Sequence, residues 1–269
     1  MLNEIHCGDC TDVLKTMPDE HIDLTVTSPP YDNLRTYNGF VFDFEGIAKE
    51  LYRVTKPGGV VVWVVGDATV KGSETGTSFR QALYFKDVCG FNLHDTMIYE
   101  KDGVGARGSN YCYWQVFEYM FVLSKGTPSV ARRIKDSPNK WAGSSTYGKA
   151  KRRNNDGELV PVSDKIVVQS HGFRTNIWRI PTGQSKTTKD RIAYEHPAIF
   201  PEKLAEDHII SWSNPGDTVL DPMCGSGTTC KMAAKNGRQY IGIDISEEYC
   251  EIARKRIASI QPSLALQEG

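Results

Sequence analysis

Long apolar runs are missing from this chain of 269 residues. Because no stretch reaches about 18 consecutive apolar residues, the sequence predicts no membrane-spanning helix. The first residues, Met1–Glu4, lack the basic and apolar character of a secretion signal, so we expect a cytoplasmic protein. The seven cysteines are odd in number and scattered, which fits a reducing compartment better than a disulfide framework.

Signatures of metal and phosphate binding are also scarce. The segment Cys7-Gly8-Asp9-Cys10 contains a C-x-x-C, but a structural metal site needs a second ligand pair, and Cys224 and Cys230 lack the spacing. The sequence has no G-x-x-x-x-G-K-[ST] pattern, which disfavours a loop that cradles phosphates. We therefore expect no metal ion.

Positive charge is concentrated in one part of the chain, although the formal net charge is only −1. Between Lys125 and Ile192 there are 15 Lys and Arg against 5 Asp and Glu, a local charge of +10; the other residues hold 17 against 28, or −11. Such an asymmetry indicates a surface for a polyanion, with a solvated loop of chance basic residues as the alternative.

Apolar strand patterns alternate with helical patterns outside the basic stretch. Ile22–Ser28, Val60–Val65, Thr218–Asp221 and Tyr240–Ile245 read as strands, and helical patterns separate them. This alternation predicts an α/β fold with a largely parallel sheet that is covered on both faces. A functionless loop as long as the basic stretch would be unusual, so we predict a domain of residues 1–125 and 192–269 with an insertion at 126–191.

A Gly-rich turn follows the strand that ends at Asp221. In Asp221-Pro222-Met223-Cys224-Gly225-Ser226-Gly227-Thr228-Thr229 the glycines allow a tight turn and a close approach of a ligand. Asp244 ends the next strand about twenty residues later, where a carboxylate can accept both hydroxyls of a ribose. An acid before the turn would repel a pyrophosphate but suits a sulfonium or ammonium centre. A plain strand–helix turn is the alternative.

A proline corner, Thr27-Ser28-Pro29-Pro30-Tyr31, ends another strand. An exocyclic amine of a nucleobase is a poor nucleophile because its lone pair is delocalised into the ring. The Ser28 hydroxyl and the Pro29 carbonyl could accept its two protons, while the fixed φ of the prolines holds them in place. Tyr31 would stack on an extruded base and offset part of the cost of extrusion. The alternative is a structural corner without chemistry.

The motifs together resemble the DNA amino-methyltransferases, which modify cytosine-N4 or adenine-N6. The order of TSPPY, the basic region, and DPMCGSGTT with GID is similar to the beta class of that family. The resemblance covers roughly residues 3–125 and 192–260. It implies a Rossmann-like S-adenosylmethionine-dependent fold that is cyclically permuted, with a mixed, mostly parallel seven-stranded sheet. It also implies S-adenosyl-L-methionine as cofactor and double-stranded DNA as partner.

The resemblance carries roles over to matching residues. The catalytic positions are Ser28, Pro29, Pro30 and Tyr31. The cofactor positions are Asp9, His196, Phe200, Asp221, Pro222, Cys224, Gly225, Gly227, Thr228 and Asp244. The resemblance also implies that the basic insertion at 126–191 is the target-recognition region. The positions expected to contact DNA are Arg132, Arg133, Lys151, Arg152, Arg153 and Arg174, and Trp141, Tyr147, Trp178 and Arg174 are candidates for reading base edges.

Ser28 decides which base we expect to be methylated. In the family, S-P-P-Y is typical of cytosine-N4 enzymes, whereas D-P-P-Y or N-P-P-Y is typical of adenine-N6 enzymes. We therefore expect cytosine, with adenine as the alternative. Methylation at carbon 5 is disfavoured because the chain has no Pro-Cys pair. An RNA or protein methyltransferase and a non-catalytic DNA-binding subunit are remoter readings. We expect a bacterial, archaeal or phage-encoded protein that associates with the nucleoid. Whether it is a monomer or a homodimer, and whether a cognate restriction endonuclease accompanies it, stays open.

Overall fold

The computed structural model describes residues 1–30, 42–102, 107–109, 112–146, 151–161, 166–183 and 185–260. Two compact units are present: unit 1 joins Met1–Arg132 with Asn176–Gly269, and unit 2 is Arg133–Thr175. Unit 2 covers fewer residues than the insertion expected at 126–191. The predicted positions Tyr31 and Tyr147 lie outside the described residues.

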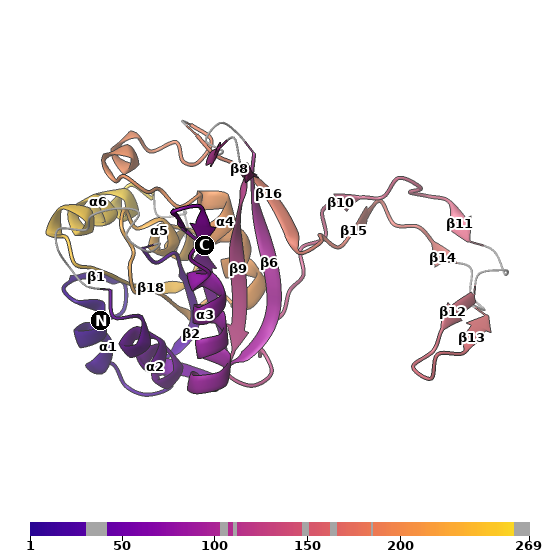
Figure 1. Ribbon diagram of the computed structural model, residues 1–269, viewed down its shortest axis with the longest axis horizontal. Helices are drawn as coiled ribbons and strands as arrows, with labels where there is room; N and C mark the ends of the chain where they lie inside the picture. Colours follow the sequence, from indigo (N-terminus) through magenta and orange to yellow (C-terminus); the bar gives the residue numbers. More distant parts are fainter. Residues whose placement is uncertain are drawn as a thin grey trace, which may run out of the picture. The chain divides into compact units, whose positions relative to one another are not determined.

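Unit 1 is built on a sheet of eight strands in the order β1-β18-β17-β2-β3-β9-β6-β16 (Figure 1). These strands are β1 (Glu4–Cys7), β2 (Ile22–Thr27), β3 (Thr55–Val65), β6 (Asn92–Asp102), β9 (Phe117–Ser124), β16 (Ile177–Pro181), β17 (Thr218–Asp221) and β18 (Gln239–Asp244). Only β9 runs against its neighbours, β3 and β6; every other pairing in this sheet is parallel. The predicted α/β fold with a mixed, mostly parallel sheet is confirmed.

The sheet has one strand more than the seven expected, and the difference is β16. This strand pairs in parallel with β6, from Ile177 opposite Ile98 to Pro181 opposite Asp102. Only alternate residues of this edge strand are buried, so its polar sequence gives no apolar run. Trp178, a candidate for reading bases, is only 5% exposed and stacks on His208 at 4.5 Å between ring centroids. Its ring belongs to the core and is not available to DNA.

Helices cover both faces of the sheet (Figure 1). They are α1 (Cys10–Lys15), α2 (Phe44–Val54), α3 (Thr77–Tyr84), the π-helical turn η1 (Phe85–Cys89), the 3-10 helix η2 (Arg191–Glu195), α4 (Glu202–Trp212), α5 (Thr228–Lys235) and α6 (Glu247–Ala258). Residues of α1, α2 and η1 share one core cluster with Trp63 and Phe121. On the opposite face of β9, Met120 contacts His208 of α4. Within the described residues, no helix is long and apolar enough to cross a membrane.

Short strand pairs lie outside the main sheet. In unit 1 they are β4 (Thr69–Val70) with β5 (Ser73–Glu74), and β7 (Arg107–Ser109) with β8 (Cys112–Gln115). In unit 2 they are β10 (Ser137–Pro138) with β15 (His171–Gly172), β11 (Ser145–Thr146) with β14 (Ile166–Val167), and β12 (Lys151–Arg153) with β13 (Leu159–Pro161).

Several predicted site residues of unit 1 lie at or beside one edge of the sheet. Strands β1, β18, β17 and β2 are neighbours and run in the same direction, so their carboxyl ends share an edge. These ends carry Cys7, Asp244, Asp221 and Thr27. The first strand lies beside the last one, which is the arrangement that a cyclic permutation implies. Ligands of open α/β sheets bind at this edge.

Candidate active site

The Gly-rich turn between β17 and α5 requires glycine at two positions. Gly225 and Gly227 have φ of +49° and +75°, in the left-handed region that favours glycine. A Cβ at Gly225 would lie 2.8 Å from Nε2 of His196, and one at Gly227 would lie 2.5 Å from Cβ of Ala253. The turn is therefore fixed both by its backbone conformation and by close packing. Pro222, Cys224 and Thr228, which are also predicted cofactor positions, are buried in the same segment.

Asp221 is a buried carboxylate at the start of this turn, with 6% of its surface exposed. Its Oδ1 accepts hydrogen bonds from Oγ1 of Thr27, at 2.8 Å, and from the amide of Met223, at 3.3 Å. Burial raises the pKa of Asp221 to about 6, although these hydrogen bonds oppose the shift. A carboxylate that ionises reluctantly in a dry site favours a cationic partner.

Asp244, at the end of β18, supports the turn from the neighbouring strand. Its Oδ2 accepts from the amide of Gly225 and its Oδ1 from the amide of Ser246, each at 2.9 Å. Burial raises the pKa of Asp244, and the amide hydrogen bonds oppose that rise. A carboxylate offers about four lone-pair sites. Two therefore remain for the hydroxyls of a ribose, so the geometry fits the predicted role.

The proline corner lies directly beside the cofactor turn. Thr27, the residue before Ser28, donates to Asp221, and Oγ1 of Thr229 donates to the carbonyl of Val26 at 3.1 Å. Pro29 is buried, and Ser28 and Pro30 are half-buried. These two hydrogen bonds join β2 to both ends of the Gly-rich segment. The described part of the proline corner, Ser28–Pro30, thus follows a strand that is fixed to the Gly-rich segment, although the two are nearly 200 residues apart in sequence.

Asp9 has a structural explanation in addition to its predicted place near the adenine. It is the N-cap of α1, and its Oδ1 accepts from the amides of Thr11, at 2.8 Å, and Asp12, at 3.2 Å. Such a cap stabilises a helix by about 1 kcal/mol. The side chain is exposed at the same edge of the sheet as Asp244. Its contact with the cofactor stays a prediction.

The segment before α4 closes against the Gly-rich turn through His196. The buried imidazole packs against Gly225 and meets the ring of Tyr249 edge-on, at 4.3 Å between centroids. Its Nδ1 lies 2.8 Å from the carbonyl of Ala198. Phe200, half-buried, stands two residues before α4. This placement agrees with the predicted closing role of the segment, which stays a prediction.

Arg256 of α6 is a central residue that local sequence patterns did not reveal. Its side chain is fully buried, and Nη1 donates to the carbonyl of Ser226 at 2.7 Å and to Oγ1 of Thr228 at 3.0 Å. On its other side the guanidinium pairs with Asp190 at 3.0 Å and with Glu202 at 2.9 Å. Arg256 therefore ties the cofactor turn to the segment that precedes α4.

Lys231 of α5 completes this charge cluster. Its Nζ lies 2.6 Å from Oδ2 of Asp190 and 2.7 Å from Oε1 of Glu202. Burial raises the pKa of Asp190, but the hydrogen bonds from Lys231 and Arg256 outweigh it and leave that pKa below its usual value. Two cations and two carboxylates thus compensate each other beside the cofactor turn. We call Lys231, Arg256, Asp190 and Glu202 the charge cluster.

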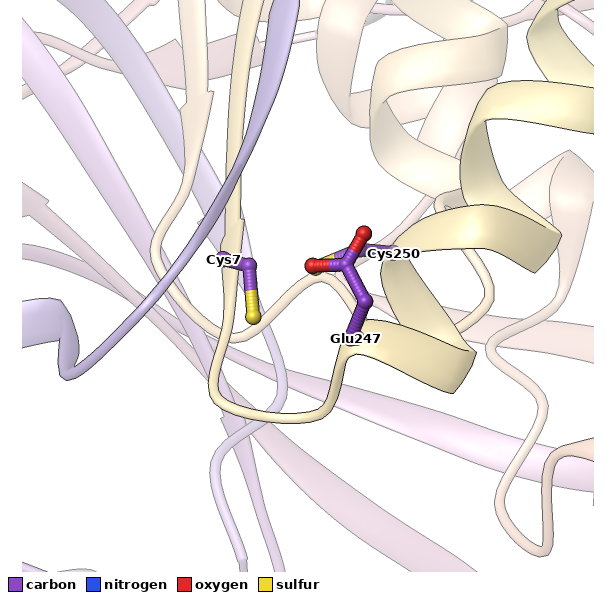
Figure 2. A group of neighbouring side chains, drawn as sticks. All are labelled: Cys7, Glu247 and Cys250. Atoms are coloured by element: carbon purple, nitrogen blue, oxygen red, sulfur yellow. The ribbon is translucent and has the colours of Figure 1, made fainter.

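Cys7 of the C-x-x-C pairs with α6 and not with Cys10. Its thiol, the carboxylate of Glu247 and the thiol of Cys250 lie within 4.8 Å of one another (Figure 2). Each group already has protein partners, since Cys250 donates to the carbonyl of Asp244 at 3.5 Å and Glu247 pairs with Arg254 at 2.6 Å. Burial raises the pKa of Cys250 to about 12. These protein partners account for the arrangement of the three groups without a metal ion.

Four of the six basic residues expected to contact DNA already have intramolecular partners. Arg132 donates to the carbonyl of Ser213 at 3.0 Å. The guanidinium of Arg133 lies 3.9 Å from the centroid of the Phe173 ring, and Nε of Arg174 donates to Asp136 at 3.1 Å. Lys151, Arg152 and Arg153 are exposed on β12, and Nη1 of Arg153 donates to the carbonyl of Gly157 at 2.7 Å. Contact of these residues with DNA stays a prediction.

The permuted sheet, the Gly-rich turn and the acid on the next strand define an S-adenosyl-L-methionine-dependent methyltransferase. The chain belongs to the N6/N4 DNA methylase family, whose model, described as DNA methylase, matches residues 22–255. The enzyme is an S-adenosyl-L-methionine-dependent DNA methyltransferase of the type found in restriction-modification systems. The predicted family, enzyme class and cofactor are confirmed.

Individual relatives support this assignment. The orphan methyltransferase M.BamHII of Bacillus amyloliquefaciens is 60% identical over 93% of this chain and 90% of its own length. The type II methyltransferase M.ScaI of Streptomyces caespitosus is 29% identical over 97% of this chain and 83% of its own. A DNA modification methylase structure from Thermus thermophilus, in complex with S-adenosyl-L-methionine, is similar, with a TM-score of 0.64 and 25% identity, over 95% of this chain and 93% of that one.

Proposed function

We propose that the enzyme transfers a methyl group to the exocyclic N4 amine of a cytosine flipped out of double-stranded DNA. The observation that carries this proposal is the hydrogen bond of 2.8 Å between Thr27 and Asp221. It fixes the strand that leads into Ser28 against the turn that would hold the methionine end of the cofactor. An amine bound at the corner would therefore meet the methyl donor at short range, and proximity would supply much of the rate gain.

The residues of the corner act on the amine and not on the methyl group. The Ser28 hydroxyl and the Pro29 carbonyl accept hydrogen bonds from the two N–H groups of the amine and draw the nitrogen toward tetrahedral geometry. As the bond from nitrogen to the methyl carbon forms, the bond from that carbon to sulfur breaks, and the nitrogen then loses one proton to solvent. Pro29 and Pro30 keep φ fixed, so these acceptors do not have to reorganise. Tyr31 stacks on the flipped base, which contributes about 1–3 kcal/mol. When bound, S-adenosyl-L-methionine supplies an electrophilic methyl group on a sulfonium centre.

Asp221 and Asp244 hold the two ends of the cofactor in this proposal. Asp221 faces the positive methionine end, and Asp244 accepts the ribose hydroxyls with its remaining lone pairs. His196 and Phe200 close the site from the segment before α4, and Asp9 lies at the adenine end. The 60% identical relative is named an orphan methyltransferase, which favours an enzyme that works on cellular DNA without a dedicated endonuclease.

The choice of cytosine over adenine rests on Ser28. Mass spectrometry of nucleosides from plasmid DNA, isolated from cells that express the protein, is expected to show 4-methylcytosine. DNA from cells expressing Tyr31→Ala is expected to contain none, because the base loses its stacking partner, whereas the purified variant should still bind S-adenosyl-L-methionine. Appearance of 6-methyladenine instead would overturn the choice of base and leave the methyltransferase assignment intact.

The pKa of Asp221 predicts how cofactor affinity depends on pH. Since burial raises this pKa to about 6, the carboxyl becomes protonated as the pH falls from 6 to 5. A neutral carboxyl no longer attracts a cation, so the affinity for S-adenosyl-L-methionine should fall by up to about tenfold per pH unit in this window. Calorimetry on the wild type and on Asp221→Asn would check it. The variant should bind weakly with a flat profile, and an equally steep profile would exclude Asp221 as the titrating group.

The stability of the free enzyme should respond to Asp221 in the opposite sense. A carboxyl whose pKa is raised in the folded state binds its proton more tightly there than in the unfolded chain. Its contribution to stability is therefore complete below the ordinary pKa of 3.8 and is lost as the pH rises through about 6.

A further inference from the structure

The described residues of unit 2 form three antiparallel strand pairs of two strands each. The pairs are β10 with β15, β11 with β14, and β12 with β13 (Figure 1). In the last two pairs, Ser145 lies opposite Val167 and Lys151 lies opposite Pro161. A step forward along one strand therefore matches an equal step back along the other, so both pairs have the same register. We call β12 and β13, with the turn between them, the ribbon.

Unit 2 has no buried core among the residues that the structure describes. The residues at 133–145, 151–161 and 167–175 are all exposed or half-buried. A two-stranded sheet without a packed face is at best marginally stable in water. The ribbon therefore needs a partner that covers it, and the chemistry of its surface indicates which one.

The surface of unit 2 is complementary to a polyanion. Residues 133–175 include nine Lys and Arg against four Asp and Glu. Large apolar side chains are exposed singly, as at Trp141, Leu159 and Phe173. Scattered apolar groups among cations do not form the continuous apolar patch that marks a protein interface. They suit the major groove of duplex DNA, which admits a two-stranded ribbon and offers acceptor atoms and thymine methyl groups.

The register of the ribbon separates its basic residues onto two faces. Lys151 lies opposite Pro161, Arg152 opposite Val160, and Arg153 opposite Leu159. Since side chains alternate along a strand and paired residues share a face, Arg153 and Leu159 lie on one face together with Lys151. Arg152 lies on the other face with Val160.

Arg153 is held in place by the turn of the ribbon. Its Nη1 donates to the carbonyl of Gly157 at 2.7 Å, while the side chain remains exposed. Gly157 has a φ of +82°, and the carboxamide of Asn154 accepts from the amides of Asp156, at 3.1 Å, and Glu158, at 2.8 Å. A guanidinium oriented in this way loses little freedom when its other donors bind O6 and N7 of a guanine.

We propose that the ribbon lies in the major groove of the substrate duplex, with the face of Lys151, Arg153 and Leu159 toward the base edges and Arg152 directed away from them. Arg153 reads a guanine, Leu159 contacts a neighbouring base edge, and Arg152 reaches at most a phosphate. This inference rests on the proposed function and specifies how the same enzyme selects its DNA sequence.

The test compares Arg153→Ala with Arg152→Ala, and uses Lys86→Ala, an exposed cation in unit 1, as the control. Methylation rates are measured on duplexes that contain the preferred site or the site with one base pair changed, and DNA affinity is measured over a range of salt. Arg153→Ala is expected to lower the ratio of the two rates by about tenfold or more. Arg152→Ala is expected to weaken the binding of both duplexes by the same factor. It should also reduce the slope of log affinity against log salt concentration by about one.

The proposal would be overturned if Arg152→Ala lowered the ratio of the two rates and Arg153→Ala left it unchanged. It would also be overturned if both variants lowered the ratio equally. Both variants replace exposed side chains, and unchanged affinity for S-adenosyl-L-methionine would show that unit 1 is intact. As a second measurement, the preferred duplex should protect the bonds after Lys151, Arg152 and Arg153 from trypsin; cleavage at an unchanged rate would contradict the proposal. Absence of DNA methylation by the wild type would instead refute the proposed function.

Discussion

Replacement of Arg256 by Met is expected to lower the free energy of unfolding by about 3–5 kcal/mol, the usual cost of breaking a buried ion pair from one side. The variant leaves Asp190 and Glu202 with Lys231 as their remaining cation in the charge cluster. It also removes the donor to the Ser226 carbonyl at 2.7 Å, inside the cofactor turn. We therefore expect the affinity for S-adenosyl-L-methionine to fall together with stability.

Arg254→Met on the same helix provides the matched control. Arg254 also pairs with two carboxylates, Glu247 and Glu251, but all three side chains are more than a third exposed. Exposed pairs contribute about 0–1 kcal/mol, so this variant should lose little. Urea denaturation gives the two free energies, and calorimetry in native buffer gives the cofactor affinities. Equal losses in the two variants would show that the charge cluster has no special role.

The sequence does not predict the role of Arg256, because its charged partners lie far away along the chain. Within α6 it stands at a position where a basic residue near the helix end would normally face solvent. Its partners, Asp190 and Glu202, are 66 and 54 residues away. Only the folded chain brings them together, because no local pattern distinguishes a buried arginine from an exposed one. The Cys7–Cys250 neighbourhood is hidden for the same reason, since the nearby Cys10 offers a misleading local pair.

Local patterns were sufficient for the central strands and for the turns at their ends. The runs that became β2, β17 and β18 are apolar because both of their faces are covered, and Pro29, Asp221 and Asp244 mark where they end. The edge strand β16 is covered only at Trp178 and Ile180, so its signal is too weak to separate from the basic stretch. The sequence thus reveals the site more readily than the outline of the sheet.

Asp244→Ala is expected to weaken the binding of S-adenosyl-L-methionine by about 100-fold or more. The change would remove the acceptor that we propose for two ribose hydroxyls, and a hydrogen bond to a charged group contributes about 1.5–3 kcal/mol. It also leaves the amides of Gly225 and Ser246 without the partners that each has at 2.9 Å, so the turn that must meet the cofactor loses its support. Both effects act in the same direction. Isothermal titration calorimetry would measure the affinity.

Two further variants separate the loss of a ligand from the loss of a structural support. Asp244→Asn keeps one acceptor oxygen, and we expect an intermediate loss of affinity, about tenfold, from the one hydrogen bond to a charged group that the amide cannot replace. Asp43→Ala removes an acceptor for the amide of Gly46 at 3.0 Å, at the start of α2. It should cost about 1 kcal/mol of stability and leave cofactor affinity unchanged. If Asp244→Ala behaved like Asp43→Ala, Asp244 would be only a support for the turn, and the ribose would have to be held elsewhere.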